Sequence, residues 1–504
     1  MGLYLIGIGG TGAKCVEAVA KLAAIGLFTE EPIKVLFVDA DETNGNLARA
    51  RTSISLYKKT YDLMPTGDKT ECGWMKSKIE SFDNWSPFAK EAQKKELKTF
   101  FNYNTIKQNQ PTLANLFDVL YTKEEREADL DVGFRGRPAI GAAVMSQVDL
   151  DRLDQDPWSS LINEIKGDPG SGKEPQIFLC GSIFGGTGAS GLPTIARLIH
   201  NKLKNEKVRD RVQIGCLFVL PYFGFSPEKE EDPDGLYARS DQFLLNTEAA
   251  LRYYVTQGQE IFDRVYLLGN QNLSRVDFSI GKDSQRNDPH FLELYAALAV
   301  RNFLLWEDPS KDKKSQNENT TPVSVVLISR QQSGTISWND IPDKAEVQRE
   351  LTNATRFAFT WLAEIAPELE EAKNEKNTRF QRLAPWMMEF YQTGSKSRGT
   401  KPDFSDVDQQ EAIGIINNWC EDYLRWLYSL HQCEGDSIAL FQADAFNPNT
   451  KFVGDQLPNL IVGDSRDKGK KSRDTVKKLK DRLKATPPGG TIGLAKSVYM
   501  ASRI

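Results

Sequence analysis

Short apolar runs alternate with helix-like periodicity at the start of the chain. The apolar run 3–8 ends in glycines, which is typical of a buried parallel strand. Apolar residues at helical spacing follow over 13–25, and a second apolar run covers 34–38, just before Asp39 and Asp41. Because strand, helix and strand follow in that order, the sequence predicts the start of a doubly wound, mostly parallel α/β sheet.

The same alternation returns after a polar, aromatic-rich stretch at 51–130. Helical patches in that stretch, at 91–101 and 111–120, predict an insertion that covers one edge of the sheet. Further strands are predicted at 176–180, 213–220 and 264–268, with one more at 323–328 beyond this α/β stretch, and further helices at 193–203, 243–255 and 291–306. We therefore expect one α/β domain over residues 1–306.

The C-terminal part of the chain has a different pattern. Residues 307–322 are charged and amide-rich without apolar periodicity, which predicts a polar linker. Helical periodicity with many aromatic residues predicts a mainly helical second domain over 323–462. In the final basic segment, 463–504, residues 463–484 hold ten Lys or Arg against four Asp. This charge indicates either a solvated helix or tail, or a docking arm for an acidic partner.

Composition and charge exclude several classes of protein. The 504 residues carry a formal net charge of −5, which argues against a surface dedicated to nucleic acid. Six Cys without a CxxC pair, and only three His, argue against a zinc or disulfide framework. No stretch approaches the roughly 18 apolar residues of a membrane span. We therefore expect a cytoplasmic protein.

A first glycine loop follows the first predicted strand. It consists of Gly7, Gly9, Gly10, Thr11 and Gly12, with Lys14 two residues later, and it fits GxGxxG between a strand and a helix. Glycines let the backbone approach phosphates, and a helix N-terminus offers free N–H groups. Taken alone, this loop fits a dinucleotide site with Asp39 on the ribose, as in an NAD-dependent oxidoreductase.

A second glycine loop, 181–191, also lies between a predicted strand and a predicted helix. An oxidoreductase needs one such loop per cofactor, so the dinucleotide reading leaves the second loop unexplained. Two glycine loops from neighbouring strands could hold one nucleoside triphosphate as an array of backbone donors. The alternative is a pair of tight strand–helix turns without a ligand.

The second loop resembles a known phosphate loop. Gly185, Gly186, Thr187 and Gly188, followed by Ala189 and Ser190, resemble the GGGTG signature of the tubulin/FtsZ family, although the first family glycine is Phe184 here. The resemblance implies a tubulin/FtsZ-like fold over 1–306 that binds GTP or GDP with Mg²⁺. Residues from Asp39 to Asn44 fall where the family binds the γ-phosphate and metal. Arg135 and Arg137 fall at its third loop and could clamp phosphate oxygens, or be ordinary surface arginines.

The resemblance also implies residues for the nucleoside. Asn270 lies where the family reads the base from a strand end, and Phe291 corresponds to its stacking aromatic residue. Tyr295 stands where the family has the Asn or Asp that recognises guanine, which leaves GTP and ATP as alternatives. Glu248 is either a ribose contact or a solvated helix residue.

In the family, hydrolysis is completed by acidic residues that reach the nucleotide of the next subunit. The corresponding candidates are Asp340 and Asp343, with Asn339 to orient water. The same segment also reads as a helix N-cap, because Pro342 and a predicted helix follow Asp340.

These features predict a GTPase that assembles head to tail into filaments, and its first expected partner is therefore a second copy of itself. The mainly helical second domain departs from tubulin and FtsZ and is closer to divergent bacterial tubulin-like proteins. The alternative is a nucleotide-binding scaffold or switch that does not polymerise and recruits protein partners through its helical domain.

Overall fold

The computed structural model describes most of the chain. The described residues are 2–28, 31–64, 72–88, 95–149, 153–168, 174–225, 238–257, 260–270, 273–279, 281–306, 324–328, 343–374, 384–392, 401–434, 441–460 and 472–503. The expected linker 307–322 lies outside them, and so do the first residues of the basic segment, up to 471. No helix within these ranges is both long enough and apolar enough to cross a membrane.

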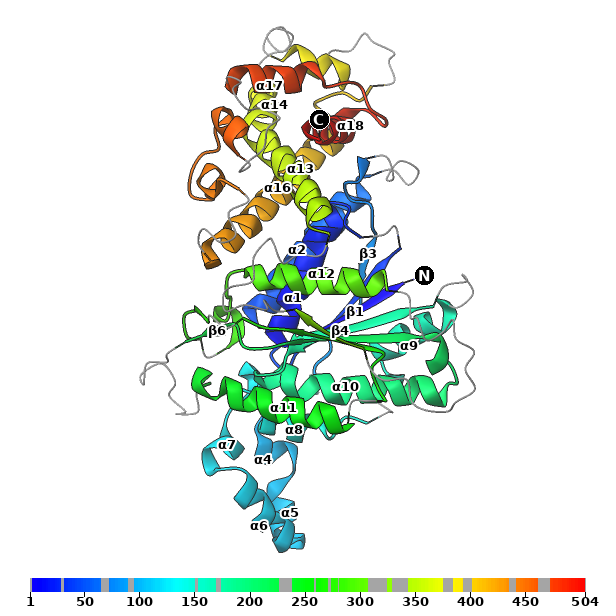
Figure 1. Ribbon diagram of the computed structural model, residues 1–504, viewed down its shortest axis with the longest axis vertical. Coiled ribbons are helices and arrows are strands. Elements are labelled where there is room, and N and C mark those ends of the chain that lie inside the picture. The colour runs from blue at the N-terminus through cyan, green and yellow to red at the C-terminus, as the bar shows by residue number, and fades with distance from the viewer. Residues whose placement is uncertain are drawn as a thin grey trace.

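A parallel sheet forms the centre of the molecule, which confirms the predicted α/β class with a mostly parallel sheet (Figure 1). In the described part of the chain its order is β3-β2-β1-β4-β5-β7-β9. The strands are β1 (Leu3–Ile8), β2 (Ile33–Val38), β3 (Ile79–Ser81), β4 (Gln176–Ser182), β5 (Gln213–Val219), β7 (Arg264–Leu268) and β9 (Ser324–Ile328). A separate short pair joins β6 (Phe223–Gly224) to β8 (Ser274–Arg275). The strand order reverses direction between β1 and β4.

Helices cover both faces of the sheet, so its central strands are mostly apolar on both faces. Along β1, Leu3 and Leu5 face one core while Tyr4, Ile6 and Ile8 face the other. The first face carries α1 (Gly9–Ala24), α2 (Gly45–Asp62) and α12 (Phe291–Leu304). The second carries α8 (Pro138–Met145), α9 (Trp158–Gly167), α10 (Gly186–Asn205) and α11 (Phe243–Gln257). This two-sided burial explains the continuous apolar runs in the sequence.

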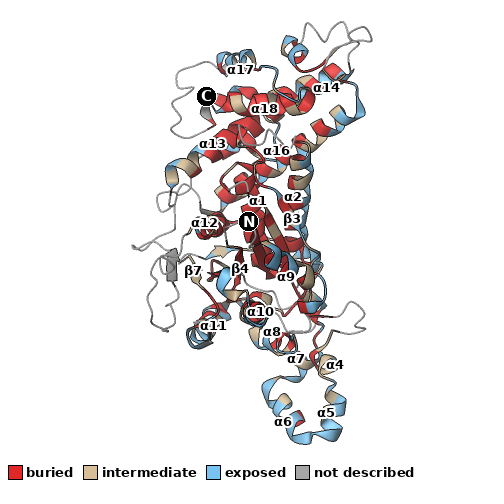
Figure 2. Cartoon of the chain, turned by 90° about the vertical axis from the view of Figure 1, so that its right-hand side faces the viewer, coloured by how far each residue is buried: buried red, intermediate tan, exposed pale blue. Residues whose placement is uncertain are grey.

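The stretch 51–130, which we expected to be one insertion, forms three different parts of the structure. Its beginning is the second half of α2, which packs on α1, and residues 79–81 are the edge strand β3. The rest includes a helical arm that projects from the body of the protein (Figures 1 and 2). The arm is built from α4 (Leu97–Phe100), α5 (Tyr103–Asn109), α6 (Pro111–Leu120) and α7 (Lys123–Glu127). The stretch therefore extends outward from the sheet as well as completing its edge.

The C-terminal helices pack on the α1–α2–α12 face of the sheet. They are α13 (Lys344–Thr360), the π-helical turn η8 (Trp361–Ile365), α14 (Ala366–Asn374), α16 (Val407–Glu434), α17 (Ser472–Asp481) and α18 (Gly490–Ser502). Trp74, buried at the junction, has ring contacts to Phe357, Trp419 and Tyr499 at 4.9, 5.4 and 6.0 Å. One continuous apolar core therefore joins the sheet to these helices.

Short 3₁₀ turns complete the described chain. They are η1 (Leu130–Val132), η4 (Arg209–Arg211), η5 (Ser240–Gln242), η6 (Lys282–Ser284), η9 (Pro385–Glu389), η11 (Ala443–Phe446) and η12 (Gly454–Asn459). Among them, Val132 of η1 lines the pocket described next, and so do Gly281 and Gln285 on either side of η6.

Candidate functional site

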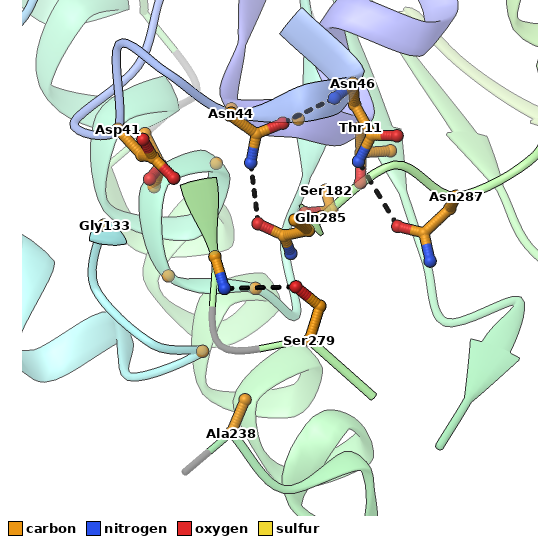
Figure 3. Close-up of a pocket in the computed structure, with 18 of the residues that line it drawn as sticks. Thr11, Asp41, Asn44, Asn46, Gly133, Ser182, Ala238, Ser279, Gln285 and Asn287 are labelled. Atoms are coloured by element: carbon orange, nitrogen blue, oxygen red, sulfur yellow. Dashed lines mark hydrogen bonds between the residues drawn. The ribbon is translucent and has the colours of Figure 1, made fainter. Parts of the chain in front are cut away.

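A pocket lies at the carboxyl ends of β1, β2, β4 and β5, where the strand order reverses (Figure 3). In open α/β sheets this point leaves a crevice in which ligands bind. Its cavity volume is about 130 Å³, below the roughly 300 Å³ at which drug-sized sites begin. The lining residues Phe225 and Ala238 flank residues 226–237, which lie outside the described part of the chain.

Both glycine loops line this pocket, and each starts a helix. Gly9, Gly10 and Thr11 begin α1, and Gly186 to Gly188 begin α10. Neither helix has a side chain that caps its first-turn N–H groups, and neither has an acidic residue in its first turn. By contrast, Asn44 caps α2 and His290 caps α12. Two positive helix ends therefore converge on one pocket, and neither helix supplies an acidic side chain of its own to them.

Several loop glycines are explained by close packing of the two loops rather than by a ligand. A Cβ on Gly188 would lie 2.2 Å from the Ser182 carbonyl oxygen, and one on Gly12 would lie 2.5 Å from that of Cys180. A Cβ on Gly7 would meet the Val16 side chain at 2.8 Å. Gly7 and Gly12 do not line the pocket, and neither do Ala189 and Ser190. These four residues, which we expected to contact phosphate, therefore lie outside the pocket lining.

Two carboxylates face the pocket from the end of β2. Asp39 is buried and accepts hydrogen bonds from the Asp41 N–H at 3.2 Å and the Thr187 hydroxyl at 3.3 Å. Burial, reinforced by the nearby charge of Asp41, raises the pKa of Asp39 to about 7. Two buried carboxylates close together would be stabilised by a bound cation, so the residues present fit a divalent ion. The described chain holds no cluster of three or more metal-ligating side chains, so phosphates and water would complete its coordination.

Lys14 lines the pocket, but its charge is already paired. Its Nζ lies 2.5 Å from Glu293 Oε1 on α12, and both side chains are almost fully buried. The Tyr222 hydroxyl donates to the same carboxylate at 3.0 Å. Lys14 therefore lies at the pocket, and its ion-pair partner is 279 positions away, so no local pattern in the sequence indicated the pair.

A segment before α12 closes one side of the pocket, and sequence reasoning missed it. The Lys282 N–H donates to Asp41 Oδ2 at 2.6 Å, and Asn44 Nδ2 donates to Gln285 Oε1 at 2.6 Å. Asn46 Nδ2 donates to Asn287 Oδ1 at 3.3 Å (Figure 3). The predicted residue Asn44 therefore both caps α2 and holds this segment.

Aromatic side chains form another part of the wall. Tyr222, Phe223, Phe225, Phe243 and Phe278 line the pocket and touch one another through ring contacts. None of the three residues expected to read the base lines it. Phe291 and Tyr295 pack against each other in the core of α12, and Asn270 follows β7. Glu248 pairs with Arg252 on the exposed face of α11.

The two predicted arginines are separated by the structure. Arg135 lines the pocket within a loop that contains positive φ angles at Gly133, Arg135 and Gly136. A guanidinium nitrogen of Arg135 donates to the Asp129 carbonyl at 3.3 Å. Arg137 does not line the pocket and pairs instead with Glu125 on the arm at 2.7 Å.

Of the candidate hydrolytic residues, only Asp343 lies in the described part of the chain, and it is far from the pocket of its own chain. Asn339 and Asp340 fall outside the described residues. Asp343 is exposed and pairs with Arg301, whose Nε donates to the Leu27 carbonyl just beyond the C-terminal end of α1. Because α1 has 16 residues and begins at the pocket, about 24 Å of helix separates Asp343 from the glycine loops.

Comparison with known proteins adds little to this geometry. No protein-family model matches the chain, and no curated protein matches it either. One similar solved structure is CetZ from Methanosaeta thermophila strain DSM 6194, with 15% sequence identity and a TM-score of 0.24. The match covers 64% of this chain and 57% of that protein, a little over half of its length. A TM-score this low carries no argument about fold or function.

Proposed function

We propose that the chain binds a nucleoside triphosphate across the two glycine loops, with GTP as the first candidate. The observation that carries this proposal is the convergence of the uncapped N-termini of α1 and α10 on one pocket. Each helix end offers backbone N–H groups and a positive dipole end to phosphate oxygens. The resemblance of residues 185–188 to the tubulin/FtsZ phosphate loop supports GTP and GDP as the ligands.

In this proposal, Asp39 and Asp41 would hold Mg²⁺ beside the phosphate chain. When bound, Mg²⁺ supplies positive charge that neutralises phosphate oxygens and the two buried carboxylates. Lys14 then serves to hold α1 against α12 through Glu293, since its charge is already paired. Phosphate recognition is thus assigned to backbone N–H groups and to the metal.

Titration calorimetry with Mg²⁺ and GTP, ATP or tripolyphosphate tests the binding proposal. The variant Thr11→Glu places a carboxylate in the first turn of α1, where it favours the helix but competes with phosphate. We expect it to weaken GTP binding at least about tenfold, whereas the matched uncharged variant Thr11→Gln loses much less. Unchanged GTP affinity in Thr11→Glu would contradict the proposed site.

We further propose that hydrolysis needs a second copy of the chain. The carboxylate of Asp343 cannot reach the pocket of its own chain, because α1 lies between them. A head-to-tail contact would bring Asp343, with Asn339 and Asp340, to the neighbouring nucleotide, where carboxylates can orient water. Such a contact repeats without closing and therefore produces a filament.

The hydrolysis rate per molecule, measured against protein concentration, tests this second step. We expect the rate to climb above a threshold concentration, and Asp340→Ala and Asp343→Ala to remove that rise while GTP still binds. A rate that is flat over the whole concentration range would rule out a site completed between copies.

One observation favours a second candidate function. Asp343 is held by Arg301 at 3.2 Å, and Arg301 also binds Glu346 at 2.7 Å, so the carboxylate is engaged within its own chain. This arrangement suits a nucleotide-binding scaffold or switch that does not polymerise and recruits partners through its helices. Tight GTP binding with a flat, slow hydrolysis rate would identify it.

A further inference from the structure

A buried oxygen in the pocket lacks a hydrogen-bond partner. Asn46, in the first turn of α2, is 3% exposed and lines the pocket (Figure 3). Its Nδ2 donates to Asn287, but its Oδ1 is buried without a partner. A buried acceptor without a donor costs roughly 1–3 kcal/mol, so native structures rarely keep one without a use.

None of the hydrogen bonds within the surrounding amide network reaches this oxygen. Asn44 Nδ2 donates to Gln285, and Asn44 Oδ1 accepts from the N–H groups of Asn46 and Leu47. The Asn287 side-chain oxygen accepts from Asn46. The free acceptor therefore belongs to a network that holds it in a fixed position.

Asn46 lies beside the first glycine loop, where the phosphates are proposed to bind. A Cβ on Gly10 would lie 3.3 Å from Asn46 Nδ2, so this amide borders the first turn of α1. Ionised phosphate oxygens are acceptors and cannot satisfy another acceptor. The donors that a nucleotide carries are the hydroxyls of its sugar and the N–H groups of its base.

We propose that Asn46 Oδ1 accepts a hydrogen bond from the nucleoside part of the bound nucleotide and so determines specificity beyond the phosphates. This inference rests on the proposed nucleotide-binding function and deepens it. The recognised chemistry is an O–H or N–H donor, whose source is either the sugar or the base.

Affinities of wild type and Asn46→Ala for GTP and tripolyphosphate, each with Mg²⁺, test the proposal. We expect Asn46→Ala to bind GTP roughly three- to tenfold more weakly, the loss of one hydrogen bond, and to bind tripolyphosphate as wild type does. The variant Asn46→Asp retains an acceptor, so its preference for GTP over tripolyphosphate should persist. Asn205→Ala, an exposed asparagine at the far end of α10, controls for substitution itself.

Nucleotide analogues identify the donor. If it is a sugar hydroxyl, wild type prefers GTP over 2′-deoxy- or 3′-deoxy-GTP and Asn46→Ala does not. If it is a base N–H, Asn46→Ala instead loses the preference of wild type for GTP over inosine triphosphate or ATP. If Asn46→Ala loses equal affinity for GTP and tripolyphosphate, or loses none, the role of Asn46 is overturned while the proposed function still stands. Failure of the unmodified chain to bind any of these probes would overturn the proposed function as well.

Discussion

At the scale of single residues, the buried carboxylate of Asp39 links the pocket to pH. Its pKa is raised to about 7, mainly because burial disfavours the charged form and also because Asp41 is close. At pH values between the ordinary aspartate pKa near 4 and this raised value, Asp39 is protonated in the folded chain but ionised in the unfolded chain. The contribution of Asp39 to stability is therefore lost as pH rises from about 4 to 7.

We expect the neutral variant Asp39→Asn to remove that pH dependence. The difference in unfolding free energy between Asp39→Asn and wild type should shift in favour of the variant by up to about 4 kcal/mol as the pH rises from 4 to 8. Denaturant unfolding of both proteins at several pH values measures this difference. Parallel pH profiles for the two proteins would show that Asp39 ionises normally in the folded chain.

A second residue-scale prediction concerns the buried pair of Lys14 and Glu293. Removing the cation leaves a carboxylate buried beside Tyr222, so we expect Lys14→Met to lower the free energy of unfolding by about 3–5 kcal/mol. The double variant Lys14→Met with Glu293→Gln should recover most of that loss. Were Lys14 chiefly a phosphate ligand, Lys14→Met would reduce nucleotide affinity and leave stability nearly unchanged.

The sequence predicted that some residues of the candidate site lie together. The two glycine loops, Asp39 and Asn44 meet at one pocket because each follows a parallel strand, which the apolar runs already indicated. The partners Glu293 and Asn287 could not be predicted, because no local pattern links residues more than 200 positions apart. Phe291 and Tyr295 are buried within α12, where aromatic residues at helical spacing usually form core.

At the scale of elements, the second glycine loop allows a matched pair of substitutions. In Gly188→Ala the new methyl group would lie 2.2 Å from the Ser182 carbonyl, so the start of α10 must shift. We expect a loss of about 1–3 kcal/mol in unfolding free energy, measured by thermal or denaturant unfolding. In Gly185→Ala the nearest atom is the Ser182 hydroxyl at 3.0 Å, which can rotate away, so stability should change far less. Equal stability of the two variants would contradict the tight packing of the loops.

The sequence predicted the strands closely and also the helix starts at 111, 243 and 291, but it missed the helix starts at the two glycine loops. The strand predicted at 264–268 is β7, and those predicted near β2, β4 and β5 differ by one or two residues at their ends. The helices predicted from 13 and 193 instead begin at Gly9 and Gly186. Glycines and Pro193 disfavour helix by intrinsic propensity, but packing against the sheet holds these first turns in place.

At the scale of the whole molecule, the C-terminal helices share a core with the sheet. Periodicity predicted their helical character, but it could not reveal that Trp74 contacts α13, α16 and α18. The buried contact of Lys21 on α1 with Asp422 on α16 joins the same two parts. A change at α1 caused by the proposed nucleotide would therefore have a direct physical route to these helices.

The central claim is that phosphates bind at the N-termini of both α1 and α10. Hydrogen–deuterium exchange with and without GTP and Mg²⁺ tests it most directly, because phosphate contacts slow exchange of the backbone N–H groups that they engage. We expect slower exchange in peptides that cover residues 9–12 and 186–188, with a smaller effect at 276–287. Unchanged exchange in both glycine loops, under conditions where GTP binds, would contradict the account.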